Sequence, residues 1–328
     1  MDAKFQELWQ ERLQPWLEGL EKERKQATGS FWIWLFVAIA IVVVGLVVVG
    51  SMNDDNFGFF FVFLVFAFFA IVAGNSKLSK LRKRVKEELN TAIAEACGMA
   101  YSVRPYSPAR FSTFRQYDLL PVFNRKHFED HFSGEIDGCD FELYEAHLEQ
   151  RRRSKNRTYY VTVFRGVLMR ITFPRKVEGV TVITRDQGWL NSLQKLSRSF
   201  GSTKLERIGL VDPKFEKAFE VYGNDQVLAR YMLTPSFMER LLDLEKALKG
   251  KRVRAMFDQD SGKGELLIAA ETGNLFEVGS MWKPLADQGR IKSIIDELNL
   301  VTGLVKMLVE SGVDSADVQA MLDRNPEV

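Results

Sequence analysis

The pattern of apolar and polar positions sets the N-terminal quarter of the chain apart from the rest. Two uncharged apolar runs, 31–50 and 57–74, lie on either side of the polar segment 51–56. Each run has the length of a helix that crosses the roughly 30 Å hydrocarbon core of a bilayer. A soluble core helix carries a single apolar stripe, whereas these runs are apolar on every side. They predict a transmembrane helical hairpin whose external turn is 51–56.

Both flanks of this hairpin carry apolar residues at spacings of three and four. Residues 1–30 predict an amphipathic helix, and residues 75–100 predict a second, basic one. An antiparallel hairpin brings its flanks side by side, which favours a packed pair of helices. The alternative is that the first helix lies on the membrane surface, with its tryptophans at the interface.

The charges around the hairpin predict its orientation. Basic residues lie on both flanks, and the only charged residues of the turn are Asp54 and Asp55. Because basic residues next to membrane spans stay on the cytoplasmic side, we expect both termini to be cytoplasmic.

The remainder of the chain predicts an α+β fold with mostly antiparallel strands. We expect a linker at 101–110, one domain at 111–312 and a C-terminal helix or tail at 313–328. Several segments are rich in β-branched and aromatic residues with partial alternation, which is typical of strands. Thr234 and Pro235 are a typical N-cap and first residue of a helix.

Two turn-like sequences predict β-hairpins. The first is "VRAMFDQDSGKGELLIAAE" around "DSGKG", and the second is "FEVYGNDQVLARYML" around Gly-Asn-Asp. On the second strand of the latter, Arg230 would lie among apolar neighbours. A buried arginine needs a carboxylate, so we expect Glu216 or Glu220 to be its partner.

Composition and motifs identify no reaction. The 328 residues carry a formal net charge of +2, so no basic footprint suggests nucleic acid. Cys97 and Cys139 follow no metal or redox spacing. Neither a phosphate-binding loop nor a serine-hydrolase elbow is present. We therefore predict no catalytic residue and no cofactor.

The segment "KHFEDHF" is the one pattern that suggests a metal ion. On a helix, His127 and His131 would share a face, and His147 or Glu135 would supply a third ligand. However, the following "SGEIDG" favours a loop, and the glutamate is not placed as in HExxH. We predict no metal site here.

The segment "RRRSKNR" is a basic cluster that predicts a surface loop. Its basic residues are Arg151, Arg152, Arg153, Lys155 and Arg157. A solvated loop is the simpler interpretation. The alternative is contact with anionic lipid headgroups or with an acidic partner, because a tethered domain stays close to a negative membrane face.

The segment "LVDPKFEKAFEVYGNDQVLARYMLTPSFMERLLDLEKAL" (210–248) resembles the signature of a bacterial family of unknown function, numbered 3137. The family pattern is "FEKxFxVYSxDQxEARYxLTPxxMERL", from which this chain departs at Gly223 and Leu228. Further blocks extend the resemblance over 128–282. The matching polar and aromatic positions, of unknown role, include Glu216, Tyr222, Asp225, Arg230 and Tyr231.

The resemblance implies a protein of the bacterial inner membrane whose soluble domain faces the cytoplasm. It also implies membrane lipids and a LemA-type membrane protein as candidate partners. The family has no established activity, so no catalytic residue is carried over.

Three functions remain open at this point. The first is a membrane-tethered interaction or scaffold module, which the absence of a catalytic signature favours. The second is an enzyme that acts on lipids or envelope precursors, and the third is an accessory subunit of a membrane complex. An enzyme predicts a pocket where several of Glu216, Asp225, Arg230 and Glu239 converge, whereas a scaffold predicts that they are dispersed.

Overall fold

The structure is a computed structural model. It describes residues 7, 9–51, 57–103, 107–136, 138–154, 157–173, 177–185, 197–200, 203–247, 251–287, 289, 291–292, 294–296 and 298–299. The chain divides into two compact units. The first is Met1–Ala96 with Glu277–Ser293, and the second is Cys97–Phe276 with Ile294–Val328. Residues 52–56 of the predicted external turn and the predicted tail at 313–328 lie outside the described residues.

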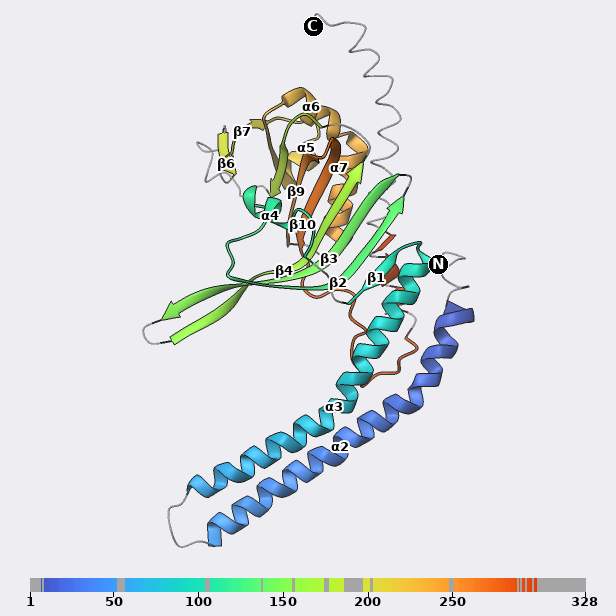
Figure 1. Ribbon diagram of the computed structural model, residues 1–328, viewed down its shortest axis with the longest axis vertical. Coiled ribbons are helices and arrows are strands. Elements are labelled where there is room, and N and C mark those ends of the chain that lie inside the picture. The colour runs from blue at the N-terminus through green and yellow to red at the C-terminus, as the bar shows by residue number, and fades with distance from the viewer. Residues whose placement is uncertain are drawn as a thin grey trace, which may run out of the picture. The chain divides into compact units, whose positions relative to one another are not determined.

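The elements follow each other along the chain as shown in Figure 1. In the first unit they are the π-helical turn η1 (Trp9–Leu13), α2 (Gln14–Ser51) and α3 (Phe57–Ala96). The helices of the second unit are α4 (Phe111–Gln116), α5 (Pro213–Ala218), α6 (Gln226–Met232) and α7 (Pro235–Ala247). Its strands are β1 (Ala100–Ser102), β2 (Arg125–Ile136), β3 (Cys139–Ser154), β4 (Arg157–Phe173), β5 (Thr181–Arg185), β6 (Ser197–Phe200), β7 (Thr203–Ile208), β8 (Phe219–Gly223), β9 (Lys251–Asp260) and β10 (Lys263–Glu271).

The flanks of the helical hairpin pack against each other. Their apolar stripes are buried at Leu13, Leu17, Leu20, Leu81, Val85 and Leu89. Two ion pairs connect the same flanks, Arg12 to Glu95 at 2.8 Å and Arg84 to Glu23 at 2.6 Å. The structure therefore confirms the packed pair of helices and not the helix on the membrane surface.

Helices α2 and α3 continue without a break through the two apolar runs, and both are long and apolar enough to cross a membrane. Small residues form their contact, because Ala38, Ala67 and Ala70 are buried there. A Cβ atom on Gly74 would lie only 2.7 Å from the Cβ atom of Trp34. Such small residues allow two helices to approach closely in a bilayer.

Residues Glu277–Ser293, which follow β10 in the chain, belong to the first unit together with α2 and α3. Glu277 forms an ion pair with Lys86 of α3 at 2.7 Å. The ring of Trp282 lies 5.2 Å from that of Phe31 and 6.1 Å from that of Trp32. Phe31 and Trp32 are at the boundary between the polar flank and the first apolar run, and tryptophans at such a boundary favour the membrane–water interface.

The second unit is built on a ten-stranded sheet, and each strand pairs with its neighbours in an antiparallel manner. The strand order is β1-β2-β3-β4-β10-β9-β5-β8-β7-β6. The predicted α+β class with a mostly antiparallel sheet is confirmed.

Helices cover both faces of this sheet (Figure 1). Phe114 of α4 belongs to a buried cluster with Tyr144 and Leu168. The ring of Phe237, in α7, lies 5.2 Å from that of Phe257 in β9. Burial of large apolar side chains on two faces is what stabilises a sheet of this size, at about 25 cal/mol per Å² of apolar area.

Two local predictions are confirmed. Strands β9 and β10 form a hairpin in which Asp260 pairs with Lys263. Helix α7 begins at Pro235, and the backbone N–H of Phe237 donates a hydrogen bond to Thr234 Oγ1 at 3.2 Å. Turn chemistry and N-cap chemistry were sufficient signals at both places.

The hairpin predicted at 219–233 is wrong. Strand β8 is followed by the short helix α6, not by a second strand. Asp225 is the N-cap of this helix, because its Oδ1 atom accepts hydrogen bonds from the backbone N–H groups of Val227 at 2.8 Å and Leu228 at 2.9 Å. Most residues of α6 are good helix formers, so the capped sequence forms a helix despite its turn-like start.

Candidate functional site

The family-motif residues make local structural contacts. Asp225 caps α6. Glu216 Oε1 accepts a hydrogen bond from the backbone N–H of Leu210 at 2.8 Å. The hydroxyl of Tyr222, a buried residue of β8, donates to Glu220 Oε2 at 3.2 Å. Each of these contacts holds a turn or a strand.

Arg230 is exposed in α6, and its neighbour Tyr231 is half-buried. The Nε atom of Arg230 is 3.5 Å from the carbonyl oxygen of Gly209, a long hydrogen bond. The predicted burial of Arg230 against Glu216 or Glu220 is therefore wrong. The cause is the helix, which carries this side chain to the surface where a strand would have buried it.

The cluster "RRRSKNR" is the end of a two-stranded ribbon and not the loop that was predicted. Its described arginines are Arg151, Arg152 and Arg153 in β3 and Arg157 in β4. Lys155 lies outside the described residues. Among the described strands, β3 beyond Glu149 and the facing part of β4 pair only with each other, and Figure 1 shows these ends extending past the neighbouring strands. We call residues 150–161 the basic ribbon.

Both sides of the basic ribbon combine arginine with tyrosine. Arg151 is paired with Tyr160 across the strands, and the next pair is Arg152 with Tyr159. Successive pairs point to opposite sides, so each side presents one such pair. All four described arginines of the ribbon are exposed, and no carboxylate of a described residue forms an ion pair with any of them. The segment 150–164 contains no Asp or Glu.

An open groove lies beside α4, with a volume of about 700 Å³. Its lining includes the cations Arg110, Arg115 and Lys126 and the aromatic residues Phe111 and Phe123, but none of the family-motif residues. The described lining contains no Asp or Glu. We call this feature the basic groove.

Asn124 and the first residue of β2, Arg125, contact the basic ribbon next to the basic groove. The side chain of Asn124 accepts a hydrogen bond from the backbone N–H of Arg151 at 2.7 Å. The guanidinium of Arg125 lies 3.4 Å from the ring centre of Tyr160, a cation–π contact. Arg125 is followed directly by Lys126 of the groove, so two adjacent residues of β2 contact the ribbon and the groove, respectively.

A row of buried charges attaches the α4 segment to the sheet. Glu265 of β10 is fully buried and receives two guanidinium groups. Arg170 Nη2 is 2.6 Å from Glu265 Oε1, and Arg110 Nε is 2.9 Å from Oε2. Arg110 also pairs with Asp258, and Arg170 lies 3.5 Å from Glu142. Because a buried carboxylate is costly without partners, this row has a clear structural role.

A β-bulge in β2 brings a histidine to the end of this row. Asp130 and His131 together stand opposite one residue of β3, Tyr144. The Nε2 atom of His131 lies 3.9 Å from Glu142 Oε2, which is within ion-pair range but too long for a hydrogen bond. His131 and the Arg170 guanidinium lower the pKa of Glu142, and burial raises the pKa of Tyr144. The Glu142 carboxyl therefore stays ionised and the tyrosine hydroxyl stays protonated.

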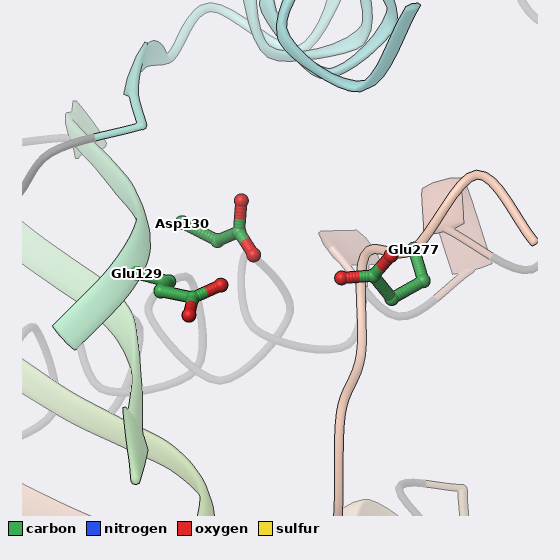
Figure 2. Close-up of side chains that lie close together, drawn as sticks. All are labelled: Glu129, Asp130 and Glu277. Atoms are coloured by element: carbon green, nitrogen blue, oxygen red, sulfur yellow. The ribbon is translucent and has the colours of Figure 1, made fainter. Parts of the chain in front are cut away.

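The segment "KHFEDHF" is part of β2 and is neither a helix nor a loop. Figure 2 shows Glu129 and Asp130 on this strand; the third side chain drawn there belongs to the other unit. His127 is exposed and pairs with Glu129 at 3.0 Å, whereas the Nε2 atom of His147 is 2.8 Å from Thr162 Oγ1. The bulge at Asp130 interrupts the alternation, so the two histidines of the segment differ in burial.

The basic groove and the buried row were missed from the sequence. Arg110 and Lys126 are separated by a helix and a connection, and no spacing rule relates them. Charged residues within β3, β4 and β10 resemble those of any solvent-facing strand, so the sequence does not mark Glu142, Arg170 and Glu265 as buried. The one usable signal was the pair Arg125 and Lys126 between two aromatic residues, Phe123 and Phe128.

One family model matches part of the chain. Residues 162–309 match DUF3137, a family of proteins of unknown function. The resemblance of the central motif to this family is thereby confirmed. The DUF3137 match begins at Thr162, beyond the basic groove and the tip of the basic ribbon, so both features lie outside the matched residues.

A solved structure is also similar. The crystal structure of the mycobacterial trehalose monomycolate transport factor A, TtfA, has a TM-score of 0.32 and 12% sequence identity. The alignment covers 66% of this chain and 96% of that chain. A search of curated proteins found no match.

Proposed function

We propose that the protein is a membrane-tethered interaction module, and that its basic ribbon contacts the anionic lipid headgroups of the membrane in which it is anchored. Two helices long enough to cross a membrane support the tether. The observation that carries the proposal is the ribbon, with four exposed arginines that lack carboxylate partners among the described residues. Each basic residue near an anionic surface contributes about 1 kcal/mol.

The proposed orientation fits this contact. Basic residues flank both apolar runs and are absent from 51–56, which supports cytoplasmic termini. The cytoplasmic leaflet carries the negative surface potential. If the second unit is tethered on that side, its cationic ribbon faces the same compartment as the anionic surface of the leaflet. We therefore propose the bacterial inner membrane as the location, with the second unit in the cytoplasm.

The interaction can be tested by purifying the full chain in a mild detergent and identifying the lipids and proteins that accompany it by mass spectrometry. The test variant changes Arg151, Arg152, Arg153 and Arg157 to Gln. The matched control removes the same charge from exposed positions elsewhere in the second unit: Lys204, Lys214, Lys217 and Arg240, also to Gln.

We expect anionic lipids to be enriched with the original protein and with the control, and to be clearly less enriched with the ribbon variant. If the lipids are unchanged and a protein is lost from the ribbon variant instead, the ribbon binds a protein partner and the lipid proposal is wrong. A LemA-type membrane protein is the partner to look for in that case.

A further inference from the structure

We propose that the basic groove binds the phosphate-bearing headgroup of an anionic phospholipid. This inference deepens the proposed function and rests on it: the ribbon provides a diffuse contact with the membrane surface, and the groove holds one lipid molecule. The groove has a volume of about 700 Å³. Sites for small molecules are commonly 300–1,000 Å³, so one headgroup and the first carbons of its chains have room.

Two cations of the groove are available to an anion. Arg115 and Lys126 are exposed, and neither forms an ion pair with any described carboxylate. Arg110 differs, because Asp258 and Glu265 already neutralise it. Arg115 and Lys126 can therefore bind a phosphate without first breaking an internal pair. Charge-assisted hydrogen bonds to phosphate are among the stronger polar contacts of proteins.

Aromatic rings hold these cations at the wall of the groove. The Lys126 ammonium lies 5.0 Å from the ring centre of Phe111, and the Arg115 guanidinium lies 5.6 Å from that of Phe123. Contacts at this distance orient a flexible cationic side chain. The same rings give the groove an apolar surface beside its charges, which suits an amphiphile with a phosphate and hydrocarbon chains.

The groove and the ribbon together favour a lipid as the source of the phosphate. Arg125, the residue before Lys126, stacks on Tyr160 of the ribbon, so the start of β2 contributes one cation to the groove and one to the ribbon. A free phosphate or a small metabolite would contact the groove alone. A lipid headgroup in a membrane is surrounded by other anionic headgroups, and the ribbon can contact those while the groove binds the one.

The test uses the full chain in a neutral detergent and follows binding by calorimetry. The ligands are dihexanoyl phosphatidylglycerol, dihexanoyl phosphatidylcholine and inorganic phosphate. The groove variant is Arg115→Gln with Lys126→Gln. The control variant is Lys204→Gln with Lys217→Gln, which removes the same charge from exposed positions outside both the groove and the ribbon.

We expect saturable binding of phosphatidylglycerol by the original protein, weakened at least about tenfold in the groove variant and by less than about twofold in the control. Phosphatidylcholine should bind much more weakly. Equal binding of the two lipids, or no effect of the groove variant, would overturn the inference. Binding of inorganic phosphate as tight as that of phosphatidylglycerol would assign the groove to free phosphate instead. A soluble lipid needs no membrane surface, so failure here is distinct from failure of the ribbon contact.

Discussion

Arg24, in the flank before the first apolar run, donates a hydrogen bond from Nη1 to the carbonyl oxygen of Met281 at 3.0 Å. The same guanidinium is held by Glu21, whose Oε1 atom is 2.6 Å from Nη2. Glu21 also accepts a hydrogen bond from the backbone N–H of Leu285 at 3.3 Å. One largely buried ion pair thus fixes the segment after β10 to α2.

Replacement of Arg24 by Gln should release this segment. The variant loses a charge-assisted hydrogen bond and leaves the Glu21 carboxylate without its cation, at a cost of about 2 kcal/mol. Amide hydrogen exchange of residues 279–287 should then become faster. Lys22→Gln removes the same charge from an exposed neighbour and should leave exchange unchanged. Equal exchange in both variants would show that Arg24 does not hold the segment.

Acid should release the same segment in the original protein. The hydrogen bond from Arg24 is the main cause that lowers the pKa of Glu21 from its ordinary value of 4.5. A carboxyl whose pKa is lowered by folding stabilises the fold above its unfolded pKa and loses that contribution as the pH falls. Exchange of 279–287, corrected for intrinsic rates, should therefore rise below about pH 4.5, and this rise should be smaller in Arg24→Gln.

The buried row of charges predicts strong coupling between Arg170 and Glu265. Arg170→Met leaves a fully buried carboxylate with one cation fewer, and Glu265→Leu leaves two arginines without it. Each change should destabilise the protein by about 3–5 kcal/mol. The double variant should be less destabilised than the sum of the two, as measured by thermal unfolding in detergent. Additive effects would contradict a shared, buried interaction.

Two residues of the family motif should differ in their effect on stability. Asp225→Ala removes the N-cap of α6 and should cost about 1 kcal/mol. Arg230→Met changes an exposed side chain with one long hydrogen bond and should cost less than about 0.5 kcal/mol. Thermal unfolding of both variants measures the difference. If Arg230→Met lost more stability than Asp225→Ala, Arg230 would have a structural role that its exposed position in α6 does not predict.

Sequence patterns predicted the elements that depend on local signals. The apolar runs, the stripes that include Leu17 and Val85, the β9–β10 turn and the N-cap at Thr234 each lie within one short stretch of chain. Their physical causes are apolar periodicity, turn chemistry and capping, which neighbouring residues decide.

The features that were missed depend on residues far apart in the chain. The bulge at Asp130 reverses the side of the sheet to which His131 points, and no pattern within "KHFEDHF" predicts this bulge. The composition of residues 226–232 is compatible with either a strand or a helix, and the Asp225 cap favours the helix. The basic groove forms where α4 and the start of β2 lie next to each other. The packing of Phe111 into its buried cluster holds α4 there.

The contact between the basic ribbon and an anionic membrane is tested most directly by energy transfer in lipid nanodiscs. A donor fluorophore is placed at the ribbon by Thr158→Cys in a Cys97→Ser background, with acceptors on lipid headgroups. A reference donor at Val211→Cys occupies a surface position that is 94% exposed and outside the ribbon. Transfer from the ribbon donor should be higher in anionic than in zwitterionic discs, and salt should reduce it because it screens exposed charges. Changing the four described ribbon arginines to Gln should abolish the dependence on lipid charge, while the reference donor shows little dependence in either protein. Transfer from the ribbon donor that is the same in both kinds of disc would contradict the account.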